Sequence, residues 1–196
     1  GEIYMNTDPQ QYRVGSGGSI WLSSSNITIN GNLFAYGGGS TNNVSAGGGG
    51  RIAISGNDIN INGNVDVGGG YSGGSFLGMA GGGGTLFINA SNSIFINGSI
   101  NTTGLIGGEI NITDSYLKLI GLYDASSFNS SNQDGKITLN YTDCSSSFEG
   151  AIFNPEAIYE TGCNIAPQIR FVESIGSVDI IENGVRNVSF NLTIYD

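Results

Sequence analysis

Residues 49–67 read GGRIAISGNDININGNVDV, and this stretch decides the fold. It contains three pairs of aliphatic residues, and one residue separates the two members of each pair. Both members of a pair therefore point to the same face of a β-strand. Gly63 stands between the second and third pairs, where a turn is expected. One copy thus predicts three short strands that all turn their apolar side inward.

The pattern recurs along the chain at nearly constant offsets. Successive copies open at Ile20, Ile52, Leu86, Ile110 and Ile137, and the third copy has one extra residue. A single coil of three strands cannot bury its apolar face, whereas stacked coils can. We therefore predict an all-β solenoid. Residues 1–5 match the opening of the copy at 108–112 and predict an earlier, incomplete coil.

Two glycine-rich inserts, 37–50 and 68–84, lengthen the spacing between copies, and 6–18 is a related stretch. Inserts at equivalent points of stacked coils should lie over one another. Neither insert contains lysine or precedes a predicted helix, which argues against phosphate binding. Apolar side chains of the second insert need burial, either within the chain or against a neighbouring subunit. They are Tyr71, Phe76, Leu77 and Met79.

The last copy, from Gly135 to about Asn154, is degenerate, as is common for a repeat that caps the core. Cys144, Phe148, Gly150 and Ile152 fit the pattern with a slip of two residues. In an oxidising compartment Cys144 and Cys163 would form a disulfide that pins this cap. The alternative is two separate buried thiols.

The charge balance excludes several function classes. The net charge is −10, and the chain has only six basic residues and no histidine. Nucleic acid and anionic membranes are therefore unsuitable partners. Without histidine, the chain lacks the commonest general base and the ligand that most zinc sites use, and we expect no cofactor. No apolar run is long enough to span a bilayer.

Sequons for N-glycosylation are unusually frequent. Chance would produce about four at this content of Asn, Ser and Thr. The ten acceptors are Asn26, Asn43, Asn89, Asn97, Asn101, Asn111, Asn129, Asn140, Asn187 and Asn191. Five fall at outward offsets of the repeat, and the others that precede residue 130 fall in turns or loops, so we expect them to be exposed. Heavy N-glycosylation would make the protein extracellular; the alternative is asparagine-rich coil chemistry.

From Ala166 onward apolar and polar residues alternate around an Asn183-Gly184 turn signal, which predicts antiparallel strands. The last strand, 187–196, has no turn after it. Either the chain continues, or this strand pairs elsewhere, for example on another subunit. We place the boundary between a repeat domain, 1–163, and a tail, 164–196.

The repeat resembles right-handed parallel β-helix proteins of the pectin-lyase-like and adhesin group. Its Gly-Gly-Ser-Ile and Gly-Gly-Arg-Ile-Ala-Ile segments, at 17–20 and 49–54, are similar to glycine-rich coils of secreted microbial surface proteins. The tail, through 166–169 and 187–190, is similar to the start of immunoglobulin-like domains. The resemblance implies a right-handed parallel β-helix with a short antiparallel β segment. It implies no particular activity, because this fold hosts lyases, hydrolases, adhesins and stalks.

Three functions compete on this evidence. The first is a non-enzymatic structural or adhesive surface protein, which polymerises through open coil ends or the last strand. The second is a carbohydrate-active enzyme of the β-helix type, which would need paired carboxylates. Its acidic candidates do not share an offset of the repeat: Asp58, Asp66, Glu109 and Asp114. The third is a binding module, with glycans as the expected ligand.

Overall fold

The computed structural model describes residues 3–4, 15–40, 45–72, 80–129, 131–162, 168–171 and 178–181. Of these, 3–4, 168–171 and 178–181 are described through their backbone alone. Contacts between residues divide the chain into two compact units, Gly1–Gly162 and Cys163–Asp196. The described residues are all-β, and nearly all strand pairs are parallel.

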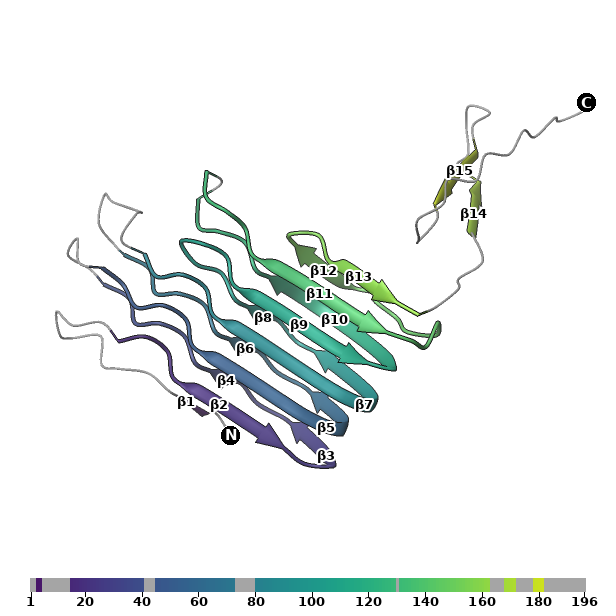
Figure 1. The fold of residues 1–196 in the computed structure, drawn as a ribbon, viewed down its shortest axis with the longest axis horizontal. Coiled ribbons are helices and arrows are strands. Elements are labelled where there is room, and N and C mark those ends of the chain that lie inside the picture. The colour runs from purple at the N-terminus through teal and green to yellow at the C-terminus, as the bar shows by residue number, and fades with distance from the viewer. Residues whose placement is uncertain are drawn as a thin grey trace, which may run out of the picture. The chain divides into compact units, whose positions relative to one another are not determined.

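Parallel strands of the first unit form three ladders, one for each aliphatic pair of the repeat (Figure 1). The opening ladder consists of β2 (Ser19–Ser23), β5 (Arg51–Ile61), β7 (Thr85–Asn97), β9 (Glu109–Asp114), β11 (Lys136–Tyr141) and β13 (Ile158–Thr161). The middle ladder consists of β3 (Asn26–Ile29), the second halves of β5 and β7, and the first half of β10 (Tyr116–Asp124). The closing ladder consists of β1 (Ile3–Tyr4), β4 (Leu33–Phe34), β6 (Val65–Asp66), β8 (Ile100–Asn101), the second half of β10, and β12 (Ala151–Asn154).

The sequence repeat predicts the strand register correctly. The residues that open successive copies are register partners in the opening ladder: Ile20, Ile52, Leu86, Ile110 and Ile137. The extra residue of the third copy lies at the junction of the opening and middle ladders, where the register between β5 and β7 shifts between Gly56 and Asp58. A slip there leaves both aliphatic pairs of β7 facing inward.

The core lies between the ladders and consists mainly of stacked aliphatic side chains. Ile52, Ile54, Leu86, Ile88 and Ile110 have no exposed surface at all. Side chains of the same kind fill one position in every copy, so each buries its neighbours above and below. This repeated burial of apolar surface holds the unit together.

Glycine pairs are needed where each insert returns to the ladders. The amide of Gly84 donates a hydrogen bond of 2.8 Å to the carbonyl of Val67, which joins the two stems of the second insert. At Gly83, a Cβ atom would collide with the carbonyl oxygen of Thr102. The chain passes so close to the neighbouring backbone that only glycine fits.

The two inserts lie over one another, as predicted. Ser40 and Ser72 form a parallel bridge, and the amide of Gly70 donates to the carbonyl of Gly47 at 2.8 Å. Tyr71 contacts Phe128 of the same chain, with ring centroids 6.1 Å apart. Phe76, Leu77 and Met79 lie outside the described residues.

Two details of the predicted register are wrong. β1 pairs with β4 of the closing ladder, Ile3 opposite Leu33, and is not an opening strand. A match of two apolar residues cannot distinguish the strands of a repeat whose pairs are alike. In the last copy, Phe153 and not Ile152 continues the inward position of Tyr123, and the Ile152 side chain is 64% exposed. The two rings, Tyr123 and Phe153, have centroids 5.2 Å apart in the core.

In the second unit, β14 (Gln168–Phe171) and β15 (Val178–Ile181) form an antiparallel pair in which Ile169 is the register partner of Ile180. This agrees with the antiparallel strands expected there. The predicted turn at Asn183-Gly184 and the strand 187–196 lie outside the described residues.

Candidate functional site: the outer faces of the ladders

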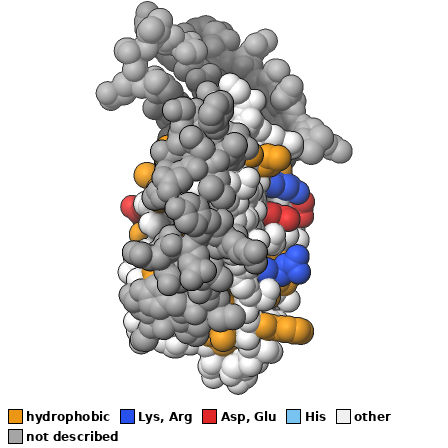
Figure 2. Space-filling view, turned by 90° about the vertical axis from the view of Figure 1, so that its left-hand side faces the viewer, with side chains coloured by type: hydrophobic (Ala, Val, Ile, Leu, Met, Phe, Trp, Pro, Cys, Tyr) orange, Lys and Arg blue, Asp and Glu red, His pale blue; other side chains and the backbone are white. Residues whose placement is uncertain are grey.

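The outer side of the opening ladder, which we call the front face, carries its side chains in columns that run along the stack. The first column holds Ser19, Arg51, Thr85, Glu109 and Lys136. Glu109 therefore lies beside Lys136, and Thr85 separates it from Arg51. Figure 2 shows acidic and basic side chains alternating along one side of the unit. The opposite signs cancel locally, so this column offers no strong attraction to a charged polymer.

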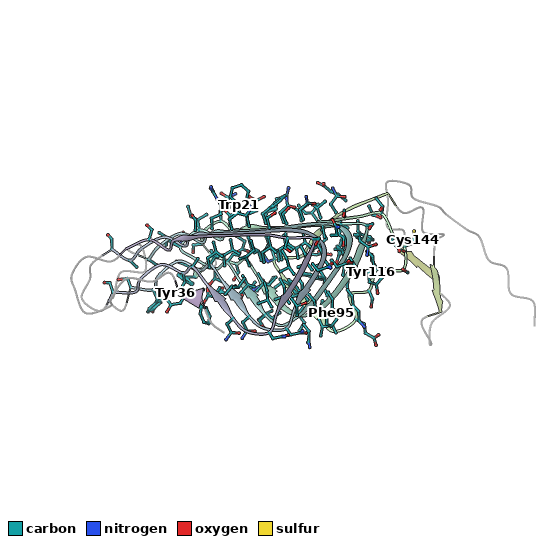
Figure 3. The ribbon with its side chains drawn as sticks, turned by 90° about the horizontal axis from the view of Figure 1, so that it is seen from below. Trp21, Tyr36, Phe95, Tyr116 and Cys144 are labelled. Carbon is teal, nitrogen blue, oxygen red and sulfur yellow. The ribbon has the colours of Figure 1, made fainter. Side chains whose placement is uncertain are left out.

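The central column of the front face carries exposed apolar side chains. Its members are Trp21, Ala53, Phe87, Asn111, Thr138 and Ile158. Trp21 is 81% exposed and points away from the core (Figure 3), whereas Phe87 is 41% exposed. Phe95 of the middle ladder lies on the opposite side of the unit, which we call the back face. Trp21 was not among the sequence candidates, although its place between Ile20 and Leu22 indicates an outward side chain.

Seven of the ten sequon asparagines lie in the described residues. Asn26 and Asn97 are exposed, and Asn89, Asn101, Asn111, Asn129 and Asn140 are partly buried. Asn89 and Asn111 occupy neighbouring strands of the front face, and Asn140 follows in β11. Asn43, Asn187 and Asn191 lie outside the described residues. The acceptors are thus less exposed than expected, and glycosylation itself stays a prediction.

Asn101 differs from the other acceptors because its side chain is part of a ladder of polar groups along the closing strands. Its Nδ2 donates to Oδ1 of Asp66 at 3.0 Å, and its Oδ1 accepts from the Thr103 amide at 3.0 Å and the Thr103 hydroxyl at 2.7 Å. Further along, Asn154 Nδ2 donates to Oδ1 of Asp124 at 3.3 Å. Such side-chain ladders satisfy buried polar groups between coils. A sugar on Asn101 would have to share the nitrogen that holds Asp66.

The acidic candidates do not gather into a catalytic pair. Burial raises the pKa of Asp66, against hydrogen bonds from Gly68 and Asn101 that lower it. Asp58 accepts from Ser93 Oγ and Asn92 Nδ2, both at 2.6 Å, and these bonds lower its pKa. The pKa of Asp66 is therefore raised and the pKa of Asp58 is lowered by their respective surroundings.

Asp114 is the candidate whose pKa responds to the charge of Asp58. Asp114 is buried at the end of β9, and its Oδ1 accepts from the Ser115 amide at 2.6 Å. Burial raises the pKa of Asp114, and the negative charge of Asp58 raises it further. Asp58 and Asp114 both lie where the opening ladder turns into the middle ladder, on strands that β7 separates.

Among the described ranges, no three His, Cys, Asp or Glu side chains group closely enough to hold a metal ion. In the same part of the chain, no helix is long and apolar enough to cross a membrane. Cys144 lies in an exposed turn after β11, and its expected partner Cys163 lies outside the described residues, so the disulfide stays a prediction. No family model, curated protein or solved structure matches this chain.

Proposed function

We propose that residues 1–162 form a right-handed parallel β-helix, and that the protein is an extracellular, N-glycosylated structural or adhesive component of a cell surface. The supporting observation is the continuous parallel pairing of equivalent strands from copy to copy, through all three ladders. Parallel strands joined by crossover connections are almost always right-handed, which supports the proposed hand.

Assembly of identical subunits is the second part of the proposal. Within the described residues, β2 and β3 pair only with β5, and β13 pairs only with β11. A strand edge that lacks a partner is a template for pairing with another chain. Near the β13 edge, Ile158 and Tyr159 are 48% and 41% exposed. Edge strands with exposed apolar side chains at one end support end-to-end association into a filament or a stalk.

Electron microscopy of the unreduced protein, as secreted by its natural source, tests assembly. Filaments with a constant axial repeat would support it and would make the ladder ends the first interface candidates. Monodisperse particles would overturn self-assembly. Mass spectrometry of glycopeptides from the same sample tests glycosylation, and unmodified asparagines at every sequon would overturn that part.

Trp21 supports a second candidate function, the binding of glycans to the front face. Its side chain is 81% exposed, and its register partner Ala53 is too small to cover it. Exposed aromatic rings offer a flat apolar surface with a polar edge, suited to sugar rings. Trp21→Ala should abolish retention on an immobilised polysaccharide that the parent protein binds, whereas equal retention of both proteins would exclude this function.

A further inference from the structure

The same acceptor segment occurs twice along strand β7, and the second copy runs two residues past the end of the strand. Phe87-Ile88-Asn89-Ala90-Ser91 and Phe95-Ile96-Asn97-Gly98-Ser99 both have phenylalanine two residues before the sequon asparagine. Residues two apart in a strand point to the same face and lie roughly 6.5–7 Å apart. Each phenyl ring therefore stands beside its acceptor on an outer face. None of the other eight acceptors has an aromatic residue at this position.

Phe87 is the ring with the more accessible surface. Its register partners are Ala53 on one side and Asn111 on the other. Ala53 is too short to cover a phenyl ring, and 41% of the Phe87 side chain remains exposed. Apolar surface left in water is unfavourable, so a group that covers this ring stabilises the folded protein.

Asn89 is well placed to supply that group. No described residue forms a hydrogen bond with its side chain, in contrast to Asn101, whose amide nitrogen donates to Asp66. A pyranose ring has faces made of C–H bonds, which pack against an aromatic face as other apolar groups do. A sugar linked to Asn89 Nδ2 starts on the same face as the Phe87 ring and within its reach.

We propose that the first sugar attached to Asn89 stacks on the Phe87 ring, so that Phe87 is the positioning platform of a built-in glycan site. The inference rests on the proposed N-glycosylation. Phe95 and Asn97 form a similar pair on the back face, where we expect weaker stacking of the sugar. There the Lys118 ammonium lies 5.4 Å from the Phe95 ring centroid and already occupies one face of the ring.

The test uses the full chain secreted from eukaryotic cells that attach uniform high-mannose glycans, with occupancy of each site measured by mass spectrometry. Four proteins form a double-mutant cycle: the parent, Asn89→Gln, Phe87→Thr and the combination. In the parent background, Asn89→Gln should lower the melting temperature by roughly 2–4 °C. In the Phe87→Thr background, the same substitution should leave the melting temperature unchanged. Trimming every glycan to its first sugar should leave the difference intact.

Matched controls separate stacking from a general effect of sugar. Asn140→Gln removes an acceptor from the same face, two residues after Thr138, and should show no coupling to Phe87→Thr. Asn97→Gln with Phe95→Thr should show a smaller coupling. A structural readout is the chemical shift of the first sugar's ring protons, which the Phe87 ring current should move upfield in the parent and not in Phe87→Thr.

The outcomes distinguish failure of the stacking proposal from failure of the glycosylation proposal. Occupied Asn89 without thermal coupling and without a ring-current shift overturns the stacking and leaves the glycoprotein proposal standing. Asn111 is the register partner of Phe87 on the neighbouring strand. If the melting temperature shows coupling between Phe87→Thr and Asn111→Gln but none between Phe87→Thr and Asn89→Gln, the assignment of the ring to Asn89 is overturned. Unmodified sequons in the protein from its natural source overturn both proposals.

Discussion

At the residue scale, the glycines of the inserts do not all have the same role. Gly83 lies against the carbonyl of Thr102, where a Cβ atom cannot be accommodated, whereas the nearest atom to a Cβ at Gly82 would be 4.0 Å away. Two neighbours in one run of four glycines thus meet opposite steric conditions. The first is required by close backbone packing, and the second is not.

This difference predicts that Gly83→Ala destabilises the fold by at least about 3 kcal/mol, because backbone on both sides must move. Gly82→Ala should change stability by less than about 1 kcal/mol. Urea unfolding followed by circular dichroism measures both. Equal effects of the two substitutions would show that the glycine run is needed for flexibility and not for packing.

The partly buried carboxyl group of Asp66 should make the stability of the protein depend on pH. Its pKa is raised in the folded state, so the folded protein binds more protons than the unfolded chain between the unfolded and folded pKa values. Stability from this group is therefore greatest at low pH and is lost as pH rises through the folded pKa. Asp66→Asn keeps Oδ1 as acceptor for Gly68 and Asn101, so it should stabilise the protein at pH 7 and remove this loss.

Asp58 is the matched control, because hydrogen bonds from Ser93 and Asn92 lower its pKa. Its contribution is present above the unfolded pKa and is lost as pH falls through the folded one. Asp58→Asn should therefore weaken the protein at pH 7 relative to pH 3. Melting temperatures of both variants between pH 3 and pH 7 test the signs, and the same slope in both would contradict the assignment.

At the scale of elements, the repeat offsets predict the register of the ladders because inward positions tolerate only aliphatic residues of similar size. Prediction fails where that constraint relaxes. β1 offers two residues and no unique register, and the last copy turns Ile152 outward because Phe153 fills the core. The exposure of Trp21 and the position of Asp114 at the junction of the ladders depend on outward side chains and on a bend, which the inward pattern does not determine.

The junction of the opening and middle ladders offers a test with deletions. Ser91 and Asn92 are exposed residues of β7 at the register shift, where they stand opposite the single residue Asn57. Deleting Asn92 restores the spacing of the other copies and removes one hydrogen bond to Asp58, so it should cost only about 1–2 kcal/mol.

Deleting Phe87 instead, within the same strand, turns the inward residues on one side of the gap toward solvent and should abolish folding. Circular dichroism and thermal unfolding distinguish the two outcomes. Loss of structure in the Asn92 deletion would show that the extra residue is essential to the bend.

At the scale of the whole molecule, the aliphatic stacks that bury the core, among the side chains that the structure describes, lie in the first unit, Gly1–Gly162. In stacked repeats, stability is approximately a sum of terms for each copy and for each interface between neighbours. Interfaces within the first unit should therefore suffice for folding. The terminal copy differs from the others because its aromatic rings, Phe148, Phe153 and Tyr159, pack against one another, with centroid distances of 5.7 to 6.3 Å.

From this we predict that a chain of residues 1–163, which keeps both Cys144 and Cys163, folds on its own and unfolds in one cooperative transition. Its melting temperature should lie within roughly 4 °C of that of the full chain, a difference of about 1 kcal/mol for a domain of this size. Hydrogen exchange should show strong protection in β5, β7, β9 and β11, which have a paired strand on both sides, and weaker protection in β13. A truncated chain that fails to fold, or uniform protection from β2 to β13, would show that residues 164–196 stabilise the last copies directly.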